Sequence, residues 1–120
     1  MTFDDLRTYC LTKPATAEKM PFGDGVLVIT VGGKMFALIA LDEFPLSVNL
    51  KCDPERALEL REQYESVLPG YHMNKKHWNT VKITGELPLK VVKEMIDHSY
   101  ILVRNSLPKK EREAIAATEE

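Results

Sequence analysis

The sequence has 120 residues, of which 44% are hydrophobic and 28% are charged, and its net charge is −2 at pH 7. This length supports one hydrophobic core and this composition excludes a disordered chain, so we expect a single domain over residues 1–120. The slight acidity argues against a protein that binds nucleic acid only by neutralising phosphates.

The N-terminal segment predicts one short helix. Thr2 and Asp5 form the pattern of a capping box, and apolar residues then recur at helical spacing as far as Leu11, before Lys13-Pro14 ends the helix. The segment lacks the basic start and apolar core of a signal peptide, and no run of about 18 apolar residues follows. We therefore expect a cytoplasmic protein that makes no contact with a membrane.

The next segment predicts an antiparallel hairpin. Residues 26–31 are apolar and mostly β-branched, and residues 35–41 resume the apolar run after an interruption. Gly32-Gly33 forms the interruption, and two glycines tolerate the positive φ angles of a two-residue turn. The first two strands of a sheet are therefore expected here.

A third strand and a second helix follow. Apolar and polar residues alternate over residues 46–51, which predicts a strand with one face on the core and the other in water. Asp53 suits the N-cap of a helix and Pro54 its first position. We expect this helix to continue through Leu68 and to close at Pro69-Gly70.

The last third of the chain predicts one more strand and two helices. Residues 78–84 alternate in polarity, residues 88–103 have helical periodicity, and a short charged helix follows Pro108. The strands are grouped between helices and do not alternate with them, which favours antiparallel pairing. The predicted class is α+β, with a meander of three strands plus a later fourth strand in one antiparallel sheet packed with helices.

The residues that usually carry catalysis or bind metals form no convincing cluster. His72 and His77 are five residues apart without a glutamate between them, which is not the spacing of a helical zinc site. The glycines form neither a dinucleotide-binding motif nor a phosphate-binding loop, and Cys10 and Cys52 suit reduced packing thiols. We expect no enzyme, no metal and no cofactor.

The segment Pro69–Val81, with the sequence PGYHMNKKHWNTV, is the most distinctive part of the chain. Residues 66–93 contain five lysines against one glutamate, an excess of four positive charges in an acidic protein. Cations, amides and aromatic rings suit contacts with phosphates and with bases. The predicted contact residues are Asn74, Lys75, Lys76, His77, Trp78 and Asn79, with Tyr71 and His72 as candidates for the wall of a pocket. In the alternative interpretation, Trp78 anchors the core and the lysines beside it are only solvated.

The run HMNKKHWNTV, the hairpin VGGKMFAL and the opening helix with its PFGDG loop resemble the MmcQ/YjbR family over nearly the whole chain. The resemblance implies a CyaY-like (frataxin-like) α+β fold and a DNA-binding role through a double-wing motif. It does not imply the iron binding of frataxin, because only Asp4 and Asp5 represent the acidic first helix that such binding needs.

Two hypotheses follow for a protein that we expect to be a monomer. In the first it binds DNA: Lys75 and Lys76 contact phosphates, Asn74 and Asn79 donate hydrogen bonds, and His77 and Trp78 shape or stack on the ligand. In the second it is a non-enzymatic module that binds a small molecule or a protein. A convex basic sheet surface would favour the first hypothesis, and a cleft beside Tyr71, His72 and Trp78 the second.

Overall fold

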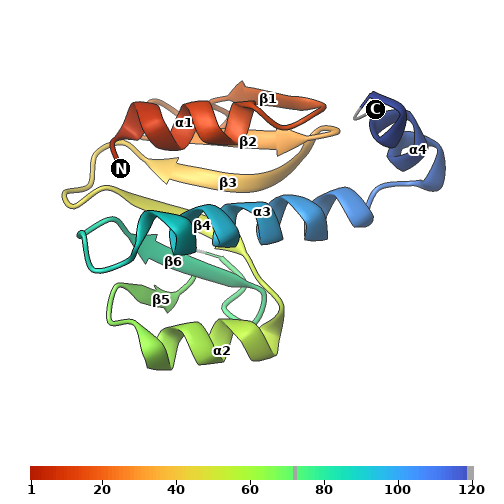
Figure 1. The fold of residues 1–120 in the computed structure, drawn as a ribbon. Coiled ribbons are helices and arrows are strands. Elements are labelled where there is room, and N and C mark those ends of the chain that lie inside the picture. Colours follow the sequence, from red (N-terminus) through yellow and green to blue (C-terminus); the bar gives the residue numbers. More distant parts are fainter. Residues whose placement is uncertain (72, 119–120) are drawn as a thin grey trace.

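The computed structural model describes residues 1–71 and 73–118, which form one antiparallel sheet of six strands and four helices (Figure 1). The strands are β1 (Thr16–Lys19), β2 (Val26–Val31), β3 (Lys34–Ala40), β4 (Ser47–Lys51), β5 (Val67–Pro69) and β6 (Trp78–Lys82). The helices are α1 (Phe3–Leu11), α2 (Pro54–Gln63), α3 (Leu89–Asn105) and α4 (Lys109–Thr118). The strand order is β1-β2-β3-β4-β6-β5, which confirms the α+β class. None of the helices described could span a membrane.

Local signals in the sequence correctly placed most element boundaries. The capping box at the start of α1 is present, because the Asp5 amide donates to Thr2 Oγ1 at 3.2 Å and the Thr2 amide donates to Asp5 Oδ2 at 2.8 Å. Gly32 and Gly33 turn the β2–β3 hairpin with φ angles of +57° and +86°. Asp53 caps α2 by accepting a hydrogen bond from the Arg56 amide.

The predicted end of α2 is wrong, and two short edge strands were not predicted. The helix ends at Gln63, because Tyr64 adopts an extended conformation with φ −128° and ψ 126°. Residues 67–69 then pair with β6 as strand β5, where the sequence predicted helix. Strand β1 pairs with β2 at the other edge. Both strands are too short to show a period, so only their pairing partners determine their structure.

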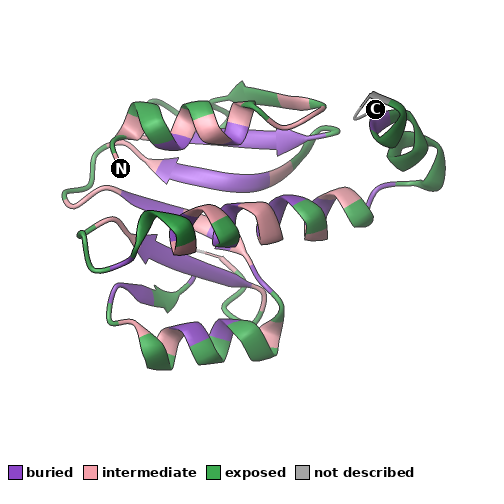
Figure 2. Ribbon diagram, in the orientation of Figure 1, coloured by how far each residue is buried: buried purple, intermediate pink, exposed green. Residues whose placement is uncertain are grey.

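The main core lies on the face of the sheet that the helices cover. Helices α1 and α3 cross this face in Figure 1, and Figure 2 shows the central strands as mostly buried and both helices as a mixture of buried, intermediate and exposed residues. Among the largest fully buried side chains of this cluster are Leu6, Ile29, Phe36, Ile39, Leu50 and Ile96. One buried hydroxyl ties α3 to the sheet: Ser99 Oγ donates to the Phe36 carbonyl at 2.6 Å and accepts from the Lys51 amide at 2.9 Å.

The opposite face of the sheet carries a smaller apolar cluster, formed by Val28, Leu38 and Trp78 with Met73 packed against them. On this face the prediction for β4 is wrong, because Ser47 was expected in water and is buried. The strands β3 and β6 flank β4, and Ser47 Oγ donates to Glu43 Oε2 at 2.8 Å. Of the three polar residues of β4, Ser47 is therefore buried, whereas Asn49 and Lys51 are half-buried.

Both cysteines are free thiols inside the protein, as the sequence predicted. Burial raises the pKa of Cys10 to about 12 and that of Cys52 to about 11. We expect an aromatic disulfide reagent to modify the native protein at least roughly 100-fold more slowly than the urea-unfolded chain at about pH 8, because so little thiolate forms. Stopped-flow absorbance measures both rates. Native thiols that react as fast as unfolded ones would contradict this assignment.

Candidate functional site

The predicted contact residues divide into exposed and buried groups. Asn74, Lys75 and Lys76 are exposed and His77 is half-buried, and all four lie in the connection that leads from β5 into β6. Tyr71 is 63% exposed at the start of this connection. His72, the second candidate for a pocket wall, lies outside the described residues. These exposed groups lie where a ligand could reach them.

Trp78 and Asn79 do not belong to the exposed surface, contrary to the prediction. Only 9% of Trp78 and 2% of Asn79 are exposed. Strand β6 begins at Trp78, so successive side chains point to opposite faces of the sheet. Trp78 packs in the cluster on the uncovered face, and Asn79 points to the helical face, where its Oδ1 accepts a hydrogen bond from Arg61 Nε at 2.7 Å. Trp78 is thus the core anchor of the alternative interpretation.

The connection before β6 is held in place by Arg61 of α2. Its Nη2 donates to the carbonyl oxygens of Lys75 and Trp78, while its Nε donates to Asn79. Gly70 is needed at the start of the connection, because a Cβ atom there would lie 2.8 Å from Trp78 Cβ and 2.9 Å from the Trp78 carbonyl oxygen. The exposed lysines therefore stand on a fixed backbone.

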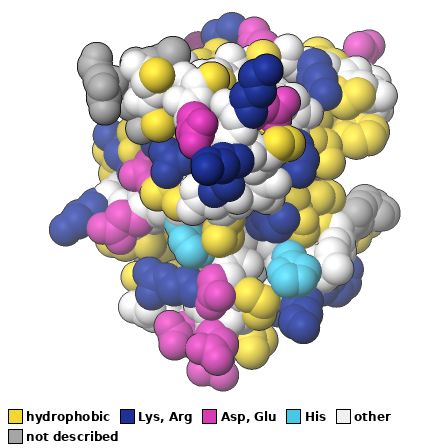
Figure 3. Space-filling view, turned by 90° about the vertical axis from the view of Figure 1, so that its right-hand side faces the viewer, with side chains coloured by type: hydrophobic (Ala, Val, Ile, Leu, Met, Phe, Trp, Pro, Cys, Tyr) yellow, Lys and Arg dark blue, Asp and Glu magenta, His cyan; other side chains and the backbone are white. Residues whose placement is uncertain are grey.

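The five lysines of residues 66–93 do not gather on one surface. Lys75 and Lys76 precede β6, whereas Lys82 ends it and Lys90 and Lys93 belong to α3, which begins beyond the other end of β6 (Figure 1). The ammonium of Lys93 lies 5.2 Å from the centre of the Tyr9 ring and so takes part in the packing of α3 against α1. Figure 3 shows acidic side chains among the basic ones on the face that it presents. The positive excess expected from the sequence is therefore divided in space.

A groove of about 340 Å³ lies on the uncovered face of the sheet. Its walls include the exposed aromatic side chains of Tyr71 and Phe22, of which Phe22 is 62% exposed. Its remaining lining is mostly apolar: Val26, Met35, Leu38, Ala40 and Met73, with polar Glu43, Ser47, Asn49 and Thr80. From the sequence, Pro21-Phe22-Gly23 could form the edge of a pocket, but the predicted site excludes Phe22 because a proline and an aromatic residue before a strand more often anchor a loop.

A second cavity, of about 220 Å³, lies on the helical face of the sheet. Its lining comes from β4, β6, α2 and α3 and comprises Leu50, Lys51, Cys52, Arg56, Leu60, Asn79, Val81, Glu94, Met95 and His98. His98 Nε2 accepts a hydrogen bond from the Asp53 amide at 3.1 Å, so the neutral ring carries its proton on Nδ1. The sequence analysis did not predict this cavity, because its walls come together only in the folded chain.

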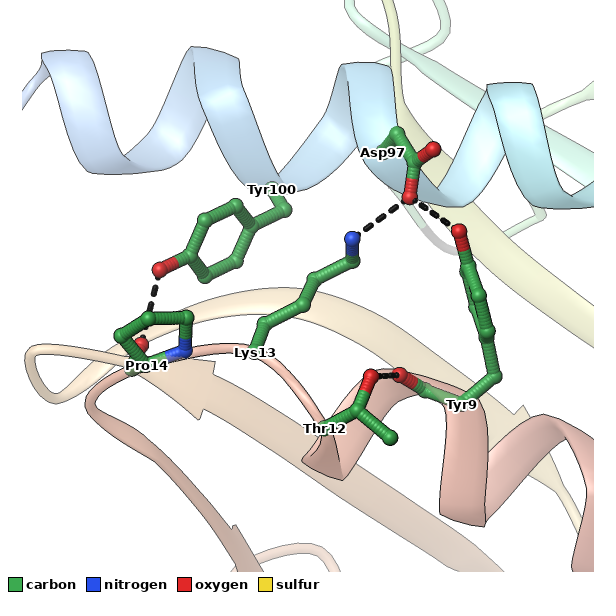
Figure 4. Close-up of polar contacts among 6 residues, drawn as sticks. All are labelled: Tyr9, Thr12, Lys13, Pro14, Asp97 and Tyr100. Atoms are coloured by element: carbon green, nitrogen blue, oxygen red, sulfur yellow. Dashed lines mark hydrogen bonds and ion pairs between the residues drawn. The ribbon is translucent and has the colours of Figure 1, made fainter. Parts of the chain in front are cut away.

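A cluster of polar side chains connects the end of α1 to α3 (Figure 4). Asp97 Oδ1 accepts from Lys13 Nζ at 2.5 Å and from the Tyr9 hydroxyl at 2.7 Å, and the Tyr100 hydroxyl donates to the Pro14 carbonyl at 2.8 Å. Burial, followed by the hydrogen bond to Asp97, raises the pKa of Tyr9 to about 12, so the phenol stays protonated. Because the carboxylate already accepts from both donors, we interpret this cluster as a contact that stabilises the fold.

Metal-binding side chains do not converge in the part of the chain that the structure describes: no three His, Cys, Asp or Glu residues there could hold an ion together. The uncovered groove and the cavity on the helical face are two concave sites on opposite sides of the sheet. Strand β6 separates them, with Thr80 lining the groove and Asn79 lining the cavity.

Comparison with known proteins finds relatives that match nearly all or about half of the chain. The YjbR family model matches residues 11–102. The Escherichia coli K12 protein named "Uncharacterized protein YjbR" is 35% identical over 115 residues, which are 96% of this chain and 98% of that relative. The Bacillus subtilis protein YyaQ is 39% identical over 57 residues, which are 48% of each chain.

Two crystal structures have the same fold. Deinococcus radiodurans protein DR2400, described with the family-model domain DUF419, superposes with a TM-score of 0.91 at 42% identity and covers 96% of this chain and 88% of its own. A Pseudomonas syringae protein superposes with a TM-score of 0.75 at 27% identity and covers 86% of this chain and 99% of its own. The antiparallel sheet and its helices are therefore common to these proteins.

Proposed function

This chain belongs to the YjbR family, and from that premise we propose that it binds DNA, without catalysing a reaction, through the groove on the uncovered sheet face and the connection before β6. The observation that carries the proposal is the pair of exposed aromatic side chains, Tyr71 and Phe22, at an apolar groove beside exposed lysines. A DNA-binding role is also what the double-wing motif implied by the family resemblance suggests.

The groove suits a base that has left the double helix. Tyr71 and Phe22 offer aromatic faces on which a base can stack, and such stacking tolerates any sequence because every base has a π face. Asn49 and Thr80 supply polar atoms within the same groove. Bases in a duplex are already stacked on each other, so we propose single-stranded or locally opened DNA as the preferred form.

The connection supplies the groups for the phosphates. Lys75 Nζ donates to the Gly70 carbonyl at 3.2 Å, and an ammonium has three donors, so two remain for a phosphate. Lys76 and Asn74 are exposed in the same connection. Glu43 lines the groove and would repel phosphates, so the backbone of the DNA is expected along the connection.

The lysines and the tyrosine should affect binding in different ways. Changing Lys75 and Lys76 together to alanine is expected to lower the magnitude of the log–log salt slope for single-stranded DNA by about 1.4, at about 0.7 per lost phosphate contact. Tyr71→Ala is expected to weaken binding by about 1–3 kcal/mol while leaving the salt slope unchanged, because it removes stacking. Fluorescence anisotropy with a labelled oligonucleotide at several salt concentrations measures both effects.

The matched control changes Lys109 and Lys110 to alanine, because these exposed lysines of α4 are also adjacent in the sequence and lie on another element. This control should bind DNA as the unchanged protein does. No binding at low salt, or an equal loss in the control, would show that the proposal is wrong.

A second candidate function is the binding of a small apolar molecule in the same groove. The apolar lining, formed by residues such as Val26, Met35 and Leu38, and the net charge of −2 favour it. This ligand would bind with little dependence on salt, and Tyr71→Ala would weaken its binding whereas the Lys75 and Lys76 changes would not. The same variants therefore separate the two functions.

A further inference from the structure

The cavity on the helical face lies on the other side of the sheet from the groove used for the proposed DNA contact. We propose that it binds a small organic carboxylate with an apolar body, and that the side-chain amide of Asn79 donates a hydrogen bond to this ligand. The inference depends on an unpaired amide, on the lining of the cavity and on the charges at its rim.

The side-chain amide of Asn79 is buried, and only its oxygen has a hydrogen-bond partner. Arg61 Nε donates to Asn79 Oδ1, whereas Nδ2 is the one buried side-chain nitrogen or oxygen in residues 1–71 and 73–117 that has no hydrogen-bond partner. A guanidinium can only donate, so the atom facing Arg61 must be the oxygen and the amide cannot be turned round. A buried donor without a partner is rare in native proteins and calls for an acceptor that completes the site.

Asn79 forms part of the wall of the cavity. Asn79 and Val81 point to the same face of β6, and both line the cavity. Arg61, which binds the amide oxygen, is not among the lining residues, and Nδ2 itself is covered in the empty cavity, so a ligand reaches it when the neighbouring side chains shift. The positive charge of Arg61 also polarises the amide and strengthens Nδ2 as a donor.

The lining defines the rest of the ligand. Leu50, Leu60, Val81 and Met95 give an apolar interior, which suits a hydrocarbon body. A cavity of about 150 Å³ holds one benzene ring. The 220 Å³ measured here therefore leaves room for a ring and one carboxylate.

The charges at the rim favour an anion. Lys51 and Arg56 line the cavity beside His98, against one carboxylate, that of Glu94 on α3. Arg56 meets a carboxylate, that of Glu59, only at 3.9 Å, so its guanidinium can turn to a ligand. A cationic ligand could pair with Glu94 but would leave Asn79 Nδ2 without an acceptor. A carboxylate can accept a hydrogen bond from the Asn79 amide and can also pair with the cations of Lys51 and Arg56.

The test uses two probes of the same shape and opposite charge, benzoate and benzamidine, added to isotope-labelled protein and followed by NMR. Benzoate is expected to bind in the millimolar range, to shift the side-chain amide resonances of Asn79, and to bind at least about tenfold more tightly than benzamidine. Tyr71→Ala, on the opposite face of the sheet, should leave benzoate binding unchanged.

Asn79→Asp is the decisive variant, because it keeps an oxygen for Arg61 and replaces the donor with a second oxygen. It is expected to reverse the preference, with benzoate affinity falling at least about tenfold and benzamidine affinity rising. The matched control is Asn49→Asp on β4, since Asn49 Oδ1 also accepts a hydrogen bond, from Thr80, and lies on the opposite face. This control should keep the preference for benzoate.

A variant at the rim keeps the test valid if Asn79→Asp does not fold. Arg56→Gln changes an exposed residue and is expected to lower benzoate affinity several-fold without lowering benzamidine affinity, because it removes a positive charge. The proposal is overturned if neither probe shifts the resonances around Asn79, which would mean that the cavity holds only water. Equal binding of both probes, or no effect of Arg56→Gln on benzoate, would overturn it as well.

Discussion

Replacing Arg61 with alanine is expected to lower the free energy of unfolding by about 2–4 kcal/mol and to loosen the connection before β6. One guanidinium serves three acceptors: Asn79 Oδ1 and the carbonyl oxygens of Lys75 and Trp78. Its loss would leave both ends of the buried Asn79 amide without a partner, which costs more than the loss of an exposed hydrogen bond. Urea denaturation measures the first effect.

Hydrogen exchange at the Trp78 amide measures how far the connection before β6 loosens. This amide donates to the Asn74 carbonyl across the connection at 2.9 Å. In Arg61→Ala this amide should exchange faster than in the unchanged protein. The matched control is Arg56→Ala on the same helix, whose nearest carboxylate is 3.9 Å away, and its effect should stay within about 0.5 kcal/mol. Equal losses in the two variants would contradict the role assigned to Arg61.

Ser99→Ala is expected to lower the free energy of unfolding by about 1–3 kcal/mol although it removes a single oxygen atom. The β3–β4 register runs from Ala40 opposite Ser47 to Ala37 opposite Leu50, so Phe36 and Lys51 would form the next pair. The Ser99 hydroxyl lies between these two residues, accepting from the Lys51 amide and donating to the Phe36 carbonyl. Alanine would leave both backbone groups unpaired where α3 crosses the sheet.

The control for this prediction is Ser106→Ala at the end of the same helix. Ser106 Oγ donates only to the Val103 carbonyl, three residues earlier, so its loss should change the free energy of unfolding by less than about 0.5 kcal/mol. Thermal or urea denaturation of both variants provides the comparison. If Ser99→Ala matched the control, the hydroxyl would not join α3 to the two strands in the way the distances indicate.

The sequence predicted the elements whose signals are local. The capping box of α1, the glycine turn and the Asp53 cap each depend on residues within three positions of one another. The short strands β1 and β5 have no such signal, because pairing with a neighbouring strand determines their conformation. The predicted helix α2 was too long for the same reason, because residues 67–69 form a strand only by pairing with β6.

The candidate site was predicted only in part, for a related reason. The sequence correctly indicated the exposed Lys75 and Lys76, but alternation in β6 does not show that side chains on both of its faces are buried. Trp78 and Asn79 are buried because Val28 lies against one face and Arg61 against the other. The two residues of the Arg61–Asn79 pair are 18 positions apart, so the folded chain alone brings them together.

The edges of the sheet explain how an uncovered apolar face can persist in a crowded solution. An open sheet edge can recruit strands from other molecules and start aggregation. Strand β5 has three residues and ends in Pro69, which cannot donate a backbone hydrogen bond. At the other edge, the four residues of β1 include Glu18, which accepts from Arg7 Nε of α1 at 2.6 Å. Both edges are thus poor templates for a further strand, which lets the groove stay accessible without seeding intermolecular β-structure.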